Sequence, residues 1–349
     1  MRLHPAMEPL QPHRPRSIIA VTMGDPAGIG PEICLRLLQK PELFGECVPL
    51  IVGDYEILSR VAEKIGVPFK APKLEALTRV LDGPSIYEPA GSLPEKNIQP
   101  GVNQAACGRA GARYIEEAVR GCLDERFAAL VTAPISKKAL ELAGINYPGH
   151  TEMLADLTGS TNYAMLMYSD EIACALVTWH QSLRSVPDSL TPDRIADVAN
   201  LASNTVGTLR DKDARLCLLG LNPHAGEEGL FGDEEQRILI PAKKKIEERG
   251  IHIDGPLPPD TAFTPQARER YDCYVAMYHD QGCIPFKMLA FETGVNITMG
   301  LPIVRTSPDH GTAFNIAWQG KAHPESFFAA YELAVRLSKP YRTGRTALV

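Results

Sequence analysis

The feature that most constrains the fold of this chain is a regular alternation between short apolar stretches and amphipathic helical patterns. The apolar stretches are bounded by glycine or proline, and the patterns between them repeat with the helical period. We predict strands at residues 17–23, 48–52, 128–132, 163–167, 173–178, 216–219 and 273–277, and helices at residues 31–38, 110–123, 192–209, 234–249 and 324–337. Such an alternation is typical of α/β proteins.

The length of the chain sets its organisation. A chain of 349 residues suits two lobes of ordinary size. Residues 71–105 are rich in Pro, Gly and Asn and are expected to form a surface excursion, whereas residues 1–16 and 338–349 are expected to be loose tails. Residues 1–16 lack the apolar segment of a signal peptide, and no apolar run approaches the ~20 residues of a membrane span.

Composition and charge argue against several classes of protein. The chain has 36 lysine and arginine residues against 42 acidic residues, a formal charge of −6. A general nucleic-acid-binding surface is therefore not expected, whereas a local basic pocket for one phosphate is compatible with this charge. The eight cysteines include no Cys-x-x-Cys pair. This spacing fits neither a disulfide framework nor a cysteine zinc site, and it predicts buried thiols in a reducing, cytoplasmic compartment.

A turn with three glycines joins the first predicted strand to the first predicted helix. Residues 24–32 read Gly-Asp-Pro-Ala-Gly-Ile-Gly-Pro-Glu, and the glycines would let the backbone and the helix amides approach an anion. The alternative is a tight turn that serves only packing. Because residue 33 is isoleucine rather than glycine, the segment is not a dinucleotide-binding fingerprint.

Three of the nine histidines, His180, His224 and His279, each follow the end of a predicted strand. Ligands bind at strand ends in open α/β sheets. Three neutral imidazoles converging there would hold a divalent cation and leave positions open for water or substrate. The alternative is that each histidine makes ordinary hydrogen bonds, since the sequence alone does not show convergence.

The segment after His279 concentrates further polar residues in apolar surroundings. Asp280 and Lys287 follow that histidine closely, and Asn296 and Arg305 come next, among Gly and Pro. A lysine and an arginine near an amide would clamp a phosphorylated or carboxylated substrate. The alternative is a pair of solvated surface cations, which the apolar flanks disfavour.

Taken together, these motifs resemble the 4-hydroxythreonine-4-phosphate dehydrogenases and their relatives that act on 4-phospho-D-threonate and 4-phospho-D-erythronate. The resemblance runs from about residue 18 to residue 337. It is carried by the segments MGDPAGIGPEI (23–33), TAPISKKAL (132–140), GINYPGHTEMLA (144–155), LNPHAGEEGLFGDEE (221–235), PPDTAF (258–263), MYHDQG (277–282) and GVNITMGLPIVRTSPDHGTAFNIAWQGKA (294–322).

The resemblance implies the fold of the isocitrate and isopropylmalate dehydrogenases, which bind NAD without a Rossmann fingerprint. One α/β lobe would comprise residues 17–142 and 300–349. The other, residues 143–299, would carry the metal histidines and the contacts of a homodimer whose active site lies at the interface.

The resemblance also implies roles for individual residues. The metal ligands would be His180, His224 and His279. The substrate ligands would be His150, Thr151, Lys287, Asn296 and Arg305. Residues 307–315 would receive the adenosine half of NAD, with contacts from His310, Gly311, Thr312, Ala313 and Asn315. The catalytic candidates are Asp260, Asp280 and Lys287, and the acceptor of the hydroxyl proton is one of these three or His150.

The implied reaction is oxidation of the C3 hydroxyl of a four-carbon, 4-phosphorylated hydroxy acid by NAD or NADP, followed by loss of carbon dioxide. The divalent metal would be zinc, with magnesium, manganese, cobalt or nickel as alternatives. Residues 143–152 and Tyr278 look more like the phospho-threonate branch than the pyridoxal phosphate branch. Three further functions are compatible with the same motifs: a dihydrodiol dicarboxylate dehydrogenase, a zinc-dependent phosphate-ester hydrolase and a non-catalytic nucleotide or phosphate sensor.

Overall fold

A computed structural model describes residues 16–91, 93 and 97–339, so nearly all of the two predicted tails lies outside the described residues. The strands in these ranges form one sheet in the order β3-β4-β2-β1-β5-β12-β11-β6-β7-β10-β8-β9. Their bounds are β1 Ser17–Thr22, β2 Cys47–Val52, β3 Lys73–Leu74, β4 Ser85–Tyr87, β5 Ala129–Thr132, β6 Ala164–Tyr168, β7 Ala173–Leu176, β8 Leu216–Leu219, β9 Ile253–Leu257, β10 Cys273–Ala276, β11 Val295–Met299 and β12 Arg305–Pro308.

The sheet consists of two parallel groups joined by antiparallel strands. Strands β3, β4, β2, β1, β5 and β12 are parallel, and so are β7, β10, β8 and β9. Antiparallel pairings join β12 to β11, β11 to β6 and β6 to β7, so the two groups run in opposite directions. The α/β class is thereby confirmed, whereas the lobe boundaries and the isocitrate-dehydrogenase-like assignment stay predictions.

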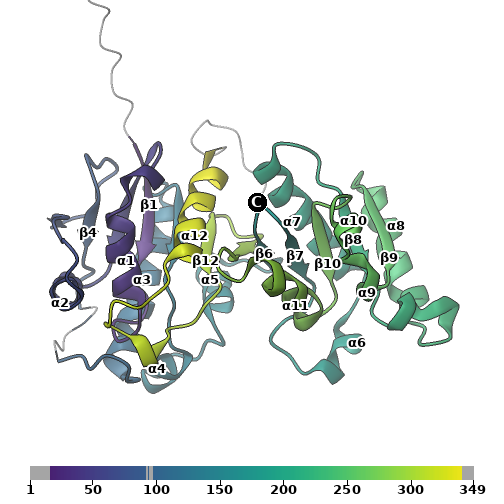
Figure 1. Cartoon of the computed structure of the whole chain (residues 1–349), viewed down its shortest axis with the longest axis horizontal. Coiled ribbons are helices and arrows are strands. Elements are labelled where there is room, and N and C mark those ends of the chain that lie inside the picture. The colour runs from purple at the N-terminus through teal and green to yellow at the C-terminus, as the bar shows by residue number, and fades with distance from the viewer. Residues whose placement is uncertain (1–15, 92, 94–96, 340–349) are drawn as a thin grey trace, which may run out of the picture.

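Helices cover both groups of strands, and the two halves lie side by side in Figure 1. Buried strands such as β1 and β2 are apolar along their length because both sheet faces are covered. The helices of the first half are α1 Gly30–Leu38, α2 Tyr55–Ile65, α3 Ala105–Leu123, α4 Lys137–Leu142, α5 His150–Thr158 and α12 Glu325–Leu337. Those of the second are α6 Val186–Ser189, α7 Pro192–Arg210, α8 Ile240–Glu248, α9 Pro259–Ala262, α10 Pro265–Arg268 and α11 His279–Ala290.

The predicted elements are all present, with shifted ends in several cases. Helix α3 begins at Ala105, five residues before the predicted start, and the predicted helix 234–249 divides into a π-helical turn, Glu235–Leu239, and α8. The described residues of 71–105 are mostly irregular, as expected of a surface excursion, but β3 and β4 within them extend the sheet. No helix within the described ranges is long and apolar enough to cross a membrane.

The glycine-rich turn at residues 24–32 packs tightly against neighbouring segments. Its amides are used inside the protein: Asp25 N donates to Pro134 O (2.9 Å), Gly28 N to Asp25 O (3.0 Å) and Ile29 N to Thr312 O (3.0 Å). A Cβ on Gly30 would lie 2.0 Å from Met23 O, so only glycine fits there. Because these three donors are paired within the protein, the structure favours the packing interpretation of the turn.

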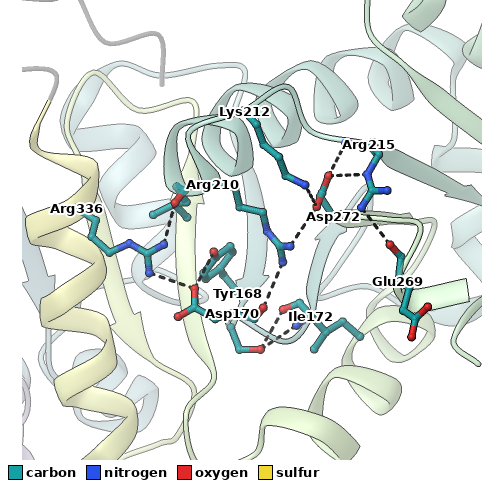
Figure 2. A network of polar contacts seen from close by, with 11 residues as sticks. Tyr168, Asp170, Ile172, Arg210, Lys212, Arg215, Glu269, Asp272 and Arg336 are labelled. Atoms are coloured by element: carbon teal, nitrogen blue, oxygen red, sulfur yellow. Dashed lines mark hydrogen bonds and ion pairs between the residues drawn. The ribbon is translucent and has the colours of Figure 1, made fainter. Parts of the chain in front are cut away.

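A buried aspartate fixes the amino end of β10. The Asp272 carboxylate forms ion pairs with Arg210 (3.1 Å), Lys212 (2.8 Å) and Arg215 (3.2 Å). Figure 2 shows these three side chains around the carboxylate. In the same view Arg336 of α12 reaches Asp170 (3.2 Å). These cations hold the pKa of Asp272 down at about 2 against the opposing effect of burial. The network anchors the strand whose other end leads into His279.

Candidate functional site

A cavity of about 240 Å³ lies over β6, β11 and β12, where the two halves of the sheet meet. Seven of the residues predicted from sequence line it, although they come from segments far apart in the chain. These residues are His150, Thr151, His180, His279, Asn296, Arg305 and His310.

Arg305 supplies a buried positive charge to this cavity. Its side chain is held by hydroxyl groups alone, with Nη1 donating to Thr298 Oγ1 (2.9 Å) and Nη2 to Thr132 Oγ1 (2.8 Å). The residue is 2 % exposed, and burial lowers its pKa to about 9. Because no carboxylate of the described chain forms an ion pair with this guanidinium, an anionic ligand would compensate its charge.

Helix α5 begins at the same cavity. Gly149 precedes it and offers no side-chain cap, so the first amides of a nine-residue helix remain available to an anion. Burial, and the nearby charge of Arg305, hold the pKa of His150 well below its usual value, while a hydrogen bond to the backbone of Ala133 opposes that shift. Burial and Arg305 therefore both favour the neutral form of the His150 imidazole.

Several buried polar atoms at the cavity have no hydrogen-bond partner among the residues that the structure places. Buried polar groups in folded proteins are almost always paired. A cluster of unpaired groups around one cavity therefore indicates a site for a polar ligand. The unpaired atoms are His150 Nε2, Glu152 Oε2, Asn296 Oδ1 and His310 Nε2.

Two of the three predicted metal histidines face each other. The rings of His180 and His279 are 6.3 Å apart between centroids. Each turns Nδ1 toward a carboxylate, His180 toward Glu152 (3.7 Å) and His279 toward Asp280 (2.7 Å). A carboxylate on one ring nitrogen leaves the other nitrogen available, as metal-binding histidines require.

The third predicted ligand, His224, lies apart from this pair. It follows β8, which neighbours β10 at the same edge, but residues 223–229 form a turn with positive φ at His224 and Ala225. The ring of His224 packs against Phe231 instead (6.0 Å between centroids). In the part of the chain that is described, no group of three or more His, Cys, Asp or Glu side chains could hold a metal ion, so one chain does not assemble the predicted site.

The predicted catalytic residues lie at or beyond the rim. Asp260 on α9 is exposed, and Asp280 contacts His279 with its side chain 70 % exposed. Lys287 pairs with Asp309 (3.0 Å), and Asp309 lines the cavity. Burial raises the pKa of Asp309, and the lysine opposes this.

Of the five residues predicted to bind NAD, only His310 lines the cavity. The other four, Gly311, Thr312, Ala313 and Asn315, follow it in a loop that packs against the glycine-rich turn. A Cβ on Gly28 would lie 3.0 Å from Thr312 O. The turn and the loop therefore support each other, and NAD binding stays a prediction.

Four polar residues that had no individual role in the sequence analysis also line the cavity: Lys137, Glu152, Ser307 and Asp309. Glu152 accepts a hydrogen bond from the Trp179 indole (3.1 Å), and that bond, with His180, holds its pKa near 2 despite burial. Glu152 and Asp309 each stand within two residues of a predicted site residue, which was a usable signal. Nothing in the sequence separates Lys137 from the adjacent Lys138.

Comparisons with known proteins show which family the chain belongs to. The family described as "Pyridoxal phosphate biosynthetic protein PdxA" matches residues 45–334. A D-threonate 4-phosphate dehydrogenase of Pectobacterium atrosepticum is 43% identical over 331 residues, covering 92% of this chain and 99% of that protein. A 4-hydroxythreonine-4-phosphate dehydrogenase of Desulforapulum autotrophicum is 40% identical over 327 residues, covering 91% and 95%.

A solved structure shows the same relationship in three dimensions. The 4-hydroxythreonine-4-phosphate dehydrogenase of Klebsiella pneumoniae superposes with a TM-score of 0.81 at 43% identity, covering 93% of this chain and 100% of that one. The sequence match, the shared fold and the polar cavity lead to one conclusion: this chain belongs to the PdxA family of dehydrogenases.

Proposed function

We propose that this dehydrogenase oxidises the C3 hydroxyl of a four-carbon, 4-phosphorylated hydroxy acid with NAD, and that the resulting β-keto acid loses carbon dioxide. The observation that carries this proposal is Arg305, a buried cation paired only with hydroxyls in a cavity with several unsatisfied polar atoms. Such a site suits a small, strongly anionic and hydroxyl-bearing molecule. The names of the relatives support both D-threonate 4-phosphate and 4-hydroxythreonine 4-phosphate as substrates.

The residues of the cavity would have different roles in binding and catalysis. Arg305 and the first amides of α5 would bind anionic groups, and Asn296 and Glu152 would orient hydroxyl or amino groups of the substrate. Of the four candidates for the acceptor of the hydroxyl proton, Asp260 and Asp280 lie outside the cavity of one chain. We favour His150, which lines the cavity with an unpaired Nε2, or Lys287, which contacts the lining residue Asp309.

We also propose that a divalent metal binds at His180 and His279 and that a second copy of the chain completes the site. A homodimer with a shared active site accounts for why one chain brings only two of the three histidines together. When bound, such a metal lowers the pKa of a coordinated hydroxyl and polarises a carbonyl. The eight cysteines are buried thiols, which supports a reducing, cytoplasmic location.

The test is formation of NADH by the purified full-length protein, followed by absorbance. D-threonate 4-phosphate and 4-hydroxythreonine 4-phosphate are compared, each with and without added zinc, and released carbon dioxide is measured in parallel. We expect metal-dependent NADH and carbon dioxide in equal amounts. A preference for the first substrate indicates sugar-acid catabolism, and a preference for the second indicates pyridoxal phosphate synthesis.

Two outcomes would contradict the proposal. Release of inorganic phosphate without NADH would indicate a phosphate-ester hydrolase instead. Binding of either compound to metal-loaded protein without any turnover would indicate a sensor.

A further inference from the structure

Lys137 is a cation of the cavity that the family resemblance did not assign. It is the first residue of α4 and lines the cavity together with Gly149, His150 and Thr151. Its amine has no hydrogen bond or ion pair to any residue that the structure places. The neighbouring Lys138 instead pairs with Glu141 on the same helix (3.0 Å). Two adjacent lysines thus have different surroundings.

The backbone around Lys137 aims its side chain at the start of α5. Ser136 caps α4 by accepting a hydrogen bond from Ala139 N (3.1 Å). A Cβ placed on Gly149 would lie 3.8 Å from Lys137 Cε. The lysine therefore passes over the residue that precedes α5, where that helix presents its uncapped amides.

The charges around the cavity suggest which substrate group the Lys137 amine would bind. The substrates of the proposed function, on which this inference rests, carry a phosphate and a carboxylate. Two described Lys or Arg residues line the cavity: Arg305, which is buried, and Lys137. Lys287 is already paired with Asp309, a third lining residue. A lysine amine and helix amides together form an ordinary phosphate-binding arrangement.

We propose that Lys137 binds the phosphate group of the substrate at the N-terminus of α5, leaving Arg305 for the carboxylate. The phosphate lies at C4, next to the carbon that is oxidised but outside the bonds that change. Lys137 is therefore a binding residue, whose loss should raise KM more than it lowers kcat.

The first experiment measures binding of inorganic phosphate to the full-length protein by calorimetry. The Kd of wild type is compared with those of Lys137→Ala, Lys137→Arg and Lys138→Ala. We expect Lys137→Ala to raise the Kd about tenfold, or about 1.4 kcal/mol, while Lys138→Ala and Lys137→Arg stay within about threefold of wild type. Equal thermal unfolding temperatures would show that the variants are folded.

The outcomes separate this inference from the proposed function. An equal loss of phosphate affinity in Lys137→Ala and Lys138→Ala would overturn the inference, because general surface charge would then suffice. So would the absence of measurable phosphate binding by wild type, or an unchanged KM for the phosphorylated substrate in Lys137→Ala. Selective loss of phosphate binding in a protein that forms no NADH would instead retain the phosphate site and reject the dehydrogenase reaction.

Discussion

At the scale of single residues, Asp25 in the glycine-rich turn is a buried carboxyl group that lowers the stability of the folded protein near neutral pH. Its side chain is buried, with Oδ1 accepting from Ala27 N (2.9 Å) and Oδ2 without a hydrogen-bond partner in the described chain. The Cys107 thiol lies beside it. Burial raises the pKa of this carboxyl to about 6. Near neutral pH the protein therefore carries a buried carboxylate that hydrogen bonds satisfy only in part.

We predict that Asp25→Asn changes how stability depends on pH. A carboxyl whose pKa is raised on folding favours the folded state below its unfolded pKa, near 3.8, and this contribution is lost as the pH rises through about 6. Relative to wild type, Asp25→Asn should gain about 2 kcal/mol in unfolding free energy between about pH 4.5 and about pH 7.5. Urea titrations at both pH values measure this, with the exposed Asp213→Asn as control. Parallel profiles for wild type and Asp25→Asn would contradict it.

Many residues of the candidate site could be predicted from sequence, because polar residues within apolar segments stand out. Asn296 and Arg305 were found in this way, and both line the cavity. The orientation of Lys137 relative to Lys138 was not predictable, because it depends on where α4 begins and on the helix that packs against it. The surroundings of His224 were equally unpredictable, because a turn with positive φ places its ring against Phe231 within one chain.

At the scale of elements, α4 is placed by its contact with α3. Gly108 of α3 lies so close to α4 that a Cβ there would stand 2.0 Å from Ala139 O. Because α4 has only six residues, its position depends on such packing rather than on its own helical stability. The close approach therefore sets where Lys137 begins its reach toward α5.

We predict that Gly108→Ala separates α3 from α4. The added methyl group should lower the free energy of unfolding by about 1–3 kcal/mol and weaken phosphate binding by displacing Lys137. The adjacent Arg109→Ala, at an exposed position of α3, should change stability by less than about 0.5 kcal/mol. Chemical denaturation and calorimetry give both quantities. Unchanged stability and phosphate affinity in Gly108→Ala would show that α4 is placed by other contacts.

Three of the elements that the sequence pattern did not predict carry residues of the candidate site or its rim. Strands β11 and β12 contain Asn296 and Arg305, so they lack the continuous apolar run of a buried strand. Helix α11 contains Gly282 and Pro285, which are typical of a break, yet it continues through both. Tertiary packing decided these elements, whereas the apolar strands were evident from local pattern alone.

At the scale of the whole molecule, the site lies where the direction of the sheet reverses. Sequence patterns reveal strands but not which strands from distant parts of the chain become neighbours. The insertion of β12, near the end of the chain, between β5 and β11 could not be read from local periodicity. That pairing brings Arg305 beside Thr132, and so it places a buried positive charge in the cavity.

The outer face of α11 leads to the last prediction, that two copies of this chain associate. Ile284, Met288 and Phe291 recur at helical spacing and are 59%, 81% and 74% exposed. A cluster of large exposed apolar side chains beside a site that one chain leaves incomplete is typical of a subunit interface. Burying Met288 in such an interface would favour association, and an aspartate in its place would oppose it through the cost of desolvating the charge.

Met288→Asp should therefore convert a dimer of twice 38.1 kDa into a monomer, as measured by sedimentation equilibrium. Val80→Asp, at an apolar position of the other half that is 51% exposed, should leave the dimer intact. Because the second chain is proposed to complete the metal site, the Met288→Asp monomer should also lose tightly bound zinc while remaining folded by circular dichroism. A monomeric wild type, or a Met288→Asp protein that stays dimeric, would show that α11 is not the interface. A Met288→Asp monomer that retains zinc would show that a single chain rearranges to hold the metal by itself.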